Sequence, residues 1–374
     1  MDSRCCAVLM GYKRLRCVAF ALLAVASLLL LMTVALHEDD LALRTDGTIA
    51  ARLQGPLEFD DPQLLSLVRR DHLQPPSTLE YDLMRGRTDS EASVYNMYIV
   101  ADAAFPALAK VIAKMFEGVR GGFFVEAGAM DGEFLSNTLA LERDLGWTGL
   151  LVEADGDMYH HLLGKHRRAW TSHACLALQP FPHREVLIKY SGNRIDLPGS
   201  SLYARAHGAL SAAESASPLK VTGGDLGRSV PQYEGVQCLP LASLLLALDV
   251  THVHFISLDV EGAEPAILRS FAWDAITVDV WLVEHITNPS RNAGDRDAPK
   301  ATPDPDPKRR SSSPVRPVGS PDSAAESSAA FASIFLSRGY ALYPMPGGAL
   351  EGNFFFVREK SDVYERLRMR GDIS

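Results

Sequence analysis

The chain has 374 residues, of which 37 are Lys or Arg and 46 are Asp or Glu, so that its net charge at pH 7 is −9. No basic stripe follows the N-terminal tail, which argues against a nucleic-acid-binding protein. Hydrophobic residues make up 47% of the chain, which at this length is enough for one α/β domain with a sizeable core.

The N-terminus contains a candidate membrane span, Cys17–Leu36. This stretch has no charged residue and is long enough, as a helix, to cross roughly 30 Å of hydrocarbon. Basic residues precede it and acidic residues follow it, so the positive-inside rule places a tail of residues 1–16 in the cytosol and the rest in the lumen. The alternative is a cleavable signal peptide, but its apolar region is normally shorter, and His37–Asp40 is a poor cleavage context. We therefore expect an uncleaved type II signal anchor.

The five cysteines lie on both sides of this span. Cys5, Cys6 and Cys17 are cytosolic in this topology, where juxtamembrane cysteines can be palmitoylated. Cys175 and Cys238 are both lumenal, and two cysteines in an oxidising compartment often form a disulfide. The alternative for this pair is two buried small hydrophobic side chains.

Residues 37–91 have the pattern of a stem between the span and a domain. An amphipathic helix is predicted over Asp60–Arg70, because an acidic capping residue and a proline stand at its start. Two prolines, Pro75 and Pro76, follow and end it. A second helix is predicted over Ala103–Phe116.

Strand and helix patterns alternate through residues 92–287, the first part of the predicted domain. The predicted strands are Gly122–Glu126, Gly149–Glu153, Ser172–Ala177, His254–Val260 and Val278–Glu284. The predicted helices are Asn137–Leu145, Met158–Lys165, Leu241–Leu248 and Pro265–Phe271. Most of the strands are continuous apolar runs, as expected when both faces of a parallel sheet are covered. The alternation predicts an α/β fold with a doubly wound, mostly parallel sheet.

Residues 288–326 contain almost no large apolar side chain, so we expect a disordered loop. The domain then resumes over residues 327–374. A helix is predicted over Ala324–Arg338, and Ala341–Tyr343 and Asn353–Arg358 indicate a closing antiparallel pair of strands.

The first predicted strand ends in an acid, Glu126, and opens into a loop that contains Gly128, Asp131 and Gly132. A second acid, Glu153, ends the next strand, and ligands of open α/β sheets bind at the carboxyl ends of strands. Small residues let the backbone approach a cofactor, and a carboxylate can accept hydrogen bonds from both ribose hydroxyls. A glycine loop also serves a tight turn simply by tolerating positive φ.

Acids gather again at the ends of the later strands, where Asp259, Glu261 and Glu264 follow one strand and Glu284 and His285 follow the next. Such side chains can hold a metal, orient a substrate hydroxyl or act as a general base. We take Asp259, Glu261 and His285 as the catalytic candidates. The alternative is a scaffold, in which Glu264 caps the following helix and Glu284 or His285 holds a loop.

Four motifs, in order, resemble the FkbM-type methyltransferase domain over most of residues 92–360. They are Glu126–Gly132, Gly146–Glu153, Ser257–Glu264 and Gly352–Val357. The resemblance implies a seven-stranded Rossmann-like sheet of the S-adenosylmethionine-dependent methyltransferase type, and methyl transfer to a hydroxyl oxygen. It also implies a cofactor site lined by Glu126, Gly128, Asp131, Gly132 and Glu153.

A second resemblance covers nearly the whole chain. Three stem segments, Asp61–Leu64, Val68–Arg70 and Leu73–Ser77, stand behind a single span and resemble the arthropod membrane protein Star and its relatives. This resemblance implies a type II protein that assists the transport of membrane cargo, such as growth-factor precursors, out of the endoplasmic reticulum and through the Golgi and endosomes. For such a protein, the domain is a binding surface at internal membranes or the plasma membrane.

Two observations favour the transport function. A lumenal domain lies across the bilayer from cytosolic S-adenosylmethionine, so catalysis would require imported cofactor, whereas cargo binding requires none. In addition, Met130 stands where FkbM enzymes usually carry Asn, and its larger side chain can crowd the cofactor. We therefore expect a Star-like transport protein, whose site either binds S-adenosylmethionine or is vestigial. The alternative is an O-methyltransferase that acts on a hydroxyl group of a glycan or small molecule.

Overall fold

The computed structural model describes residues 57–85, 87–88, 96, 105–191, 209–210, 230–285, 321–345 and 352–373. These residues belong to the unit of the chain that begins at Gly55. The predicted cytosolic tail, the membrane span and residues 288–320 of the predicted loop lie outside the described residues. Among the helices that are described, none is long and apolar enough to cross a membrane.

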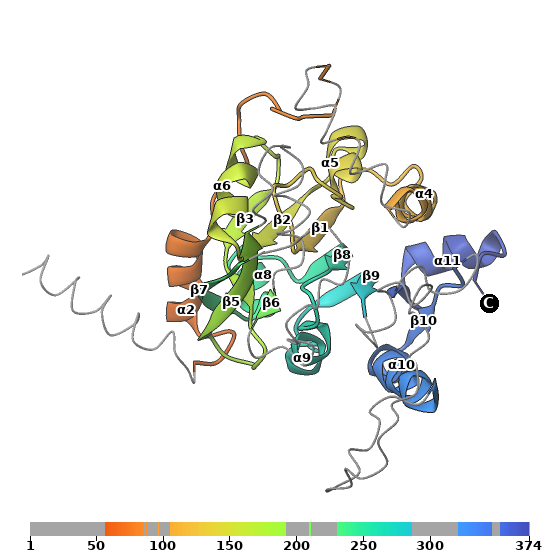
Figure 1. Cartoon of the computed structure of the whole chain (residues 1–374). Coiled ribbons are helices and arrows are strands. Elements are labelled where there is room, and N and C mark those ends of the chain that lie inside the picture. Colours follow the sequence, from red (N-terminus) through yellow and green to blue (C-terminus); the bar gives the residue numbers. More distant parts are fainter. Residues whose placement is uncertain are drawn as a thin grey trace, which may run out of the picture. The chain divides into compact units, whose positions relative to one another are not determined.

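A seven-stranded sheet forms the centre of the described fold, with the strand order β10-β11-β9-β8-β1-β2-β3 (Figure 1). The strands are β1 (Phe123–Ala127), β2 (Thr148–Glu153), β3 (Trp170–His173), β8 (His252–Leu258), β9 (Thr277–Glu284), β10 (Tyr340–Leu342) and β11 (Asn353–Arg358). Neighbouring strands from β3 to β9 are parallel, and β11 is antiparallel to both of its neighbours. The predicted mostly parallel sheet with a closing antiparallel pair is therefore confirmed.

Helices cover both faces of this sheet. They are α4 (Phe105–Met115), α5 (Leu139–Leu145), α6 (Gly156–Gly164), α8 (Leu241–Leu246), α9 (Glu264–Ser270), α10 (Pro321–Leu336) and α11 (Asp362–Met369). Side chains of α4, α5, α6 and α11 join one core cluster with Phe355 of β11. The next residue, Phe356, instead stacks on Phe335 of α10, with 3.9 Å between ring centroids. Since successive strand residues point to opposite faces, the sheet is doubly wound.

Several elements of the structure differ from the sequence prediction. α10 begins at Pro321, so that residues 321–326, counted with the predicted loop, form its first turns. The predicted strand Ser172–Ala177 is divided between β3 and a two-residue strand, β4 (Cys175–Leu176), of another sheet. The C-terminal helix α11 has no counterpart in the prediction.

A second, four-stranded sheet was not predicted. Its order is β4-β7-β5-β6, with β5 (His183–Ser191), β6 (Ala209–Leu210) and β7 (Val230–Leu239). Cys175 of β4 and Cys238 of β7 are directly paired residues of neighbouring strands, and they form a disulfide. Of the two alternatives for these cysteines, the structure therefore contains the disulfide.

The described part of the predicted stem packs against the domain. It contains α2 (Pro62–Leu67), whose first N–H groups are capped by Asp61, and a π-helical turn, η1 (Val68–His72). The Arg69 side chain donates to the backbone oxygen of Ala247, which follows α8. Both elements belong to the compact unit that begins at Gly55.

Candidate functional site

The carboxyl ends of four parallel strands bring the predicted site residues to one edge of the sheet. Glu126 lies near the end of β1 and Glu153 ends β2, while Asp259 follows β8 and Glu284 ends β9. Neighbouring strands in this part of the sheet are parallel and in register. This is the edge at which open α/β sheets bind ligands.

Glu126 shapes the loop between β1 and α5. One carboxylate oxygen accepts from the hydroxyls of Ser136 at 2.7 Å and Thr138 at 2.6 Å, and the other accepts from the Asn137 N–H at 2.6 Å. Burial raises the pKa of Glu126, and nearby Arg167 and these hydrogen bonds oppose the rise. Both oxygens therefore hold the protein's own loop.

The glycine loop is held in left-handed backbone conformations. Gly128 has φ +81°, and a Cβ there would overlap the backbone oxygen of Asp259, which follows the neighbouring strand β8. Gly132 has φ +78°, and Met130 has φ +50° although it is not glycine. Among non-glycine residues, Asn is several-fold enriched at positive φ. This backbone conformation is a physical reason for the Asn that FkbM enzymes usually carry where this chain has Met130. The Met130 side chain packs against Phe134 in a small satellite core.

Glu153 connects this loop to the start of α6. Its carboxylate accepts from the N–H groups of Met130 at 2.7 Å and Asp155 at 2.8 Å. Burial raises the pKa of Glu153 to about 7, and backbone hydrogen bonds from Asp155, Met130 and Ala154 oppose the rise. Each carboxylate oxygen accepts more than one hydrogen bond, so Glu153 retains acceptor capacity for a ligand.

Asp131 has an internal role in the described structure. Its Oδ1 accepts from the N–H groups of Glu133 at 3.0 Å and Phe134 at 2.7 Å, and Lys165 Nζ lies 3.4 Å from its Oδ2. Asp131 therefore holds the turn that follows Gly132.

Three carboxylates gather beyond β8 and β9. Asp259, Glu261 and Glu284 each place one oxygen within 4.8 Å of the other two. Burial raises the pKa of Glu284 to about 11, and the neighbouring Asp259 and Glu261 add to the rise. Burial likewise raises the pKa of Glu261 well above its usual range. Such a group either shares protons or suits a hard cation that takes oxygen ligands.

Two further residues border this acid cluster of Asp259, Glu261 and Glu284. Glu264, at the first turn of α9, accepts from the Val260 N–H at 2.8 Å, and burial raises its pKa to about 7. Val260 precedes α9, whose N-terminus has no side-chain cap, so Glu264 holds the turn before the helix rather than capping the helix as the alternative expected. Asn353 of β11 lies directly opposite Glu284 in the sheet.

The histidine candidate faces a helix. The His285 ring stacks on Phe331 of α10, with 4.0 Å between centroids and 13° between planes, and the backbone N–H of His285 donates to the backbone oxygen of Gly352. The structure therefore gives His285 a packing role, and its assignment as a catalytic base stays a prediction.

Several residues of the site were missed by the sequence analysis. Ser136, Asn137 and Thr138 have the types that precede helices, which is the signal that could have found them. Asn137 also donates to Ser257 Oγ of β8 at 3.0 Å, which joins the loop to the strand that leads to Asp259. Arg167 carried no such signal, because its buried partner Glu142 is distant in sequence.

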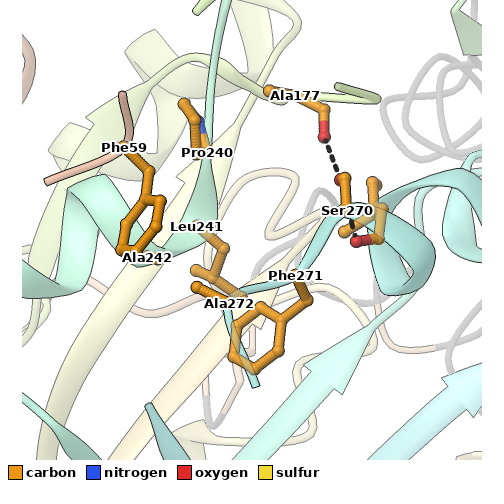
Figure 2. A pocket seen from close by; sticks show the side chains of 9 residues that line it. Phe59, Ala177, Pro240, Leu241, Ala242, Ser270, Phe271 and Ala272 are labelled. Atoms are coloured by element: carbon orange, nitrogen blue, oxygen red, sulfur yellow. Dashed lines mark hydrogen bonds between the residues drawn. The ribbon is translucent and has the colours of Figure 1, made fainter. Parts of the chain in front are cut away.

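Two cavities lie away from this edge. One, between α8 and α9, has a volume of about 10 Å³, which is room for about one water, and Ser270 donates to Ala177 across it (Figure 2). The other is an open groove of about 350 Å³. It is lined by the N-terminal segment, α6, β3, β5 and β7: Asp71, His72, Gln74, Tyr159, His173, Arg184, Gly235, Val236 and Gln237. Neither cavity includes a predicted site residue.

The residues at this edge are of the types that can hold S-adenosylmethionine, the cofactor that the resemblance implies. Glu153 supplies a buried carboxylate at the end of β2, where it can accept from a ribose diol, and the close approach at Gly128 leaves the loop backbone at the sheet edge. Glu126 and Asp131 support that loop from within. The fit thus rests on Glu153 and the loop backbone rather than on all five predicted residues.

Comparison with known proteins agrees with this geometry. No curated protein matches the chain significantly. Residues 126–306 match the family model described as the methyltransferase FkbM domain, a range that begins at Glu126 and contains Glu153, Asp259 and Glu284. The chain therefore contains an FkbM methyltransferase domain over residues 126–306.

Proposed function

We propose that this chain transfers a methyl group from S-adenosylmethionine to a hydroxyl oxygen of a glycan or small molecule. One observation carries the proposal: the loop that Glu153 holds and the acid cluster lie at the same carboxyl ends of the parallel strands. Partly buried like charges destabilise a fold, so perturbed carboxylates in such a place are a functional-site signature. The FkbM domain supports a methyltransferase-type function in general.

The chain's own residues can perform two tasks in this reaction. Glu153 would accept from the ribose hydroxyls of the cofactor, while the Met130 N–H keeps its carboxylate oriented. Protonated Glu284 donates to Asp259, and the ionised member of this pair can accept the proton of the substrate hydroxyl. S-adenosylmethionine, when bound, supplies the electrophilic methyl group.

Replacing Glu153 with Gln is expected to weaken S-adenosylmethionine binding by about 10- to 100-fold, because a charge-assisted hydrogen bond contributes roughly 1.5–3 kcal/mol. The amide NH₂ also opposes one of the two N–H groups that the carboxylate accepts. Isothermal titration calorimetry on the purified chain measures this change. Glu365→Gln, on the exposed side of α11, is the matched control and should bind like the wild type. No heat from the wild type at millimolar S-adenosylmethionine rejects the proposal.

The second candidate function is Star-like transport of membrane cargo such as a growth-factor precursor. The Cys175–Cys238 disulfide favours it, because disulfides persist mainly in the oxidising lumen and outside the cell. In this proposal, Cys17–Leu36 anchors a type II protein in the membranes of the endoplasmic reticulum, Golgi, endosomes and cell surface. The lumenal domain then binds cargo, and confinement beside the membrane strengthens a weak contact.

Surface arrival of a transmembrane growth-factor precursor tests this candidate. The full chain should promote arrival, and a form cut after Leu36 should promote it less, because it has lost the tether. Normal arrival with Glu153→Gln indicates that transport does not need the cofactor site. Equal arrival with and without the full chain contradicts the transport function.

A further inference from the structure

The N-terminal segment of residues 73–85, here called the strap, lies beside β3, the outermost strand of the central sheet. Gln74 and Thr171 of β3 exchange backbone hydrogen bonds of 2.8 and 3.0 Å. Further along, the N–H groups of Ser77 and Asp82 donate to the backbone oxygens of Arg167 and Lys165, at 3.0 and 3.3 Å. The strap is therefore held by backbone contacts up to residue 82.

The end of the strap is held by a side chain of the glycine loop. Glu133 is fully buried, and its two oxygens accept from the N–H groups of Met84 at 2.7 Å and Arg85 at 2.6 Å. Lys165 Nζ lies 3.0 Å from Glu133 and balances its charge. A buried carboxylate that accepts two backbone N–H groups and one ammonium makes strong, charge-assisted hydrogen bonds.

The same loop carries the contact to Glu153. Asp131 accepts from the Glu133 N–H, and Lys165 bridges the Asp131 and Glu133 carboxylates. Met130, next to Asp131, holds a left-handed backbone conformation, and such strain persists only when the surroundings determine it. The Met130 side chain shares a small core with Met84 of the strap. Two contacts, one polar and one apolar, thus link the strap to the loop.

We infer that Glu133 is a positioning residue that couples the strap to the cofactor loop, so that cofactor affinity depends on a segment that precedes the methyltransferase domain. The inference rests on the proposed binding of S-adenosylmethionine. Coupling is reciprocal: if the strap orders the loop for the cofactor, the cofactor orders the strap.

Hydrogen exchange of three amides in the full chain tests the coupling. The Met84 and Arg85 amides report on the strap, and the Met130 amide reports on the loop contact with Glu153. Glu133→Gln should speed exchange at Met130 and lower S-adenosylmethionine affinity at least about 5-fold, a typical coupling. S-adenosylmethionine should slow exchange at Met84 and Arg85 in the wild type but not in this variant.

Ser243→Ala is the matched control, because Ser243 is also buried and holds the N-terminal segment, through the Phe59 oxygen at 2.6 Å, without touching the loop. It should leave affinity and Met130 exchange unchanged. If Glu133→Gln does not fold, Arg85→Pro removes one donor from the strap without changing a residue of the loop.

The outcomes separate this inference from the proposed function. A wild type that binds no S-adenosylmethionine rejects the proposed function, and faster Met130 exchange in Glu133→Gln then still supports coupling of strap and loop. Binding by the wild type together with unchanged affinity and unchanged Met130 exchange in a folded Glu133→Gln chain overturns the coupling.

Discussion

Replacing Gly128 with alanine is expected to lower the free energy of unfolding by about 3 kcal/mol or more. A left-handed conformation costs an L-residue about 1–2 kcal/mol, and overpacking adds about 1–3 kcal/mol. Both costs arise at Gly128, because φ is +81° and a Cβ would overlap the Asp259 backbone oxygen. Relief requires β1 and β8 to separate at the edge where the candidate site lies. Urea unfolding of the purified chain measures the change.

Gly118→Ala is the control that separates the two costs. Gly118 has φ +75°, and a Cβ there meets nothing within 4 Å. We expect this variant to lose only the conformational part, about 1–2 kcal/mol. Equal losses in both variants would mean that the close approach of Gly128 to Asp259 is not what requires glycine.

As the pH rises from 5 to 8, the free energy of unfolding of the wild type is expected to decrease relative to that of a Glu284→Gln variant. The pKa of Glu284 in the folded chain is raised from its ordinary value of 4.5 to about 11. Between these values the folded state holds a proton that the unfolded state releases, so that the free energy of unfolding decreases as pH rises. Where the folded state binds one whole proton more than the unfolded state, the free energy of unfolding decreases by at most about 1.4 kcal/mol per pH unit.

Urea unfolding of both proteins at several pH values, with EDTA present to remove divalent cations, tests this expectation. Gln cannot ionise and removes one acid from the cluster, so the variant should be the more stable protein above neutral pH. Glu365→Gln, on the exposed side of α11, should follow the wild type. Parallel pH profiles of wild type and Glu284→Gln would contradict the raised pKa of Glu284.

The central sheet could be predicted because its strands are local patterns. β9, for example, is buried from Val278 to Val283, and its sequence is correspondingly apolar over nearly that whole run. The second sheet lacks such a pattern. Its strand β5 buries Lys189, whose charge is balanced by Asp155 and Glu234 from other segments. A buried lysine breaks an apolar pattern, and its partners are not visible in the strand's own sequence.

The candidate site could be predicted as a place rather than as a set of contacts. Acids at the carboxyl ends of parallel strands must meet at one edge, so Glu153, Asp259 and Glu284 could be brought together from the sequence. The direction and use of each side chain could not. Glu126 accepts hydrogen bonds from the loop that follows its own strand, and the His285 ring lies against Phe331.

The sequence by itself determined the α/β class, the edge of the sheet that carries the acids and the resemblance to an FkbM domain, because these follow from local apolar runs and motif order. Only the tertiary structure decided that residues 57–85 pack with the domain and that Glu133 holds Met84 and Arg85. The physical reason is that a buried carboxylate needs donors, and the backbone N–H groups that satisfy Glu133 lie 49 and 48 residues away in the chain. Residue types reveal which groups need a partner, and the fold selects the partner.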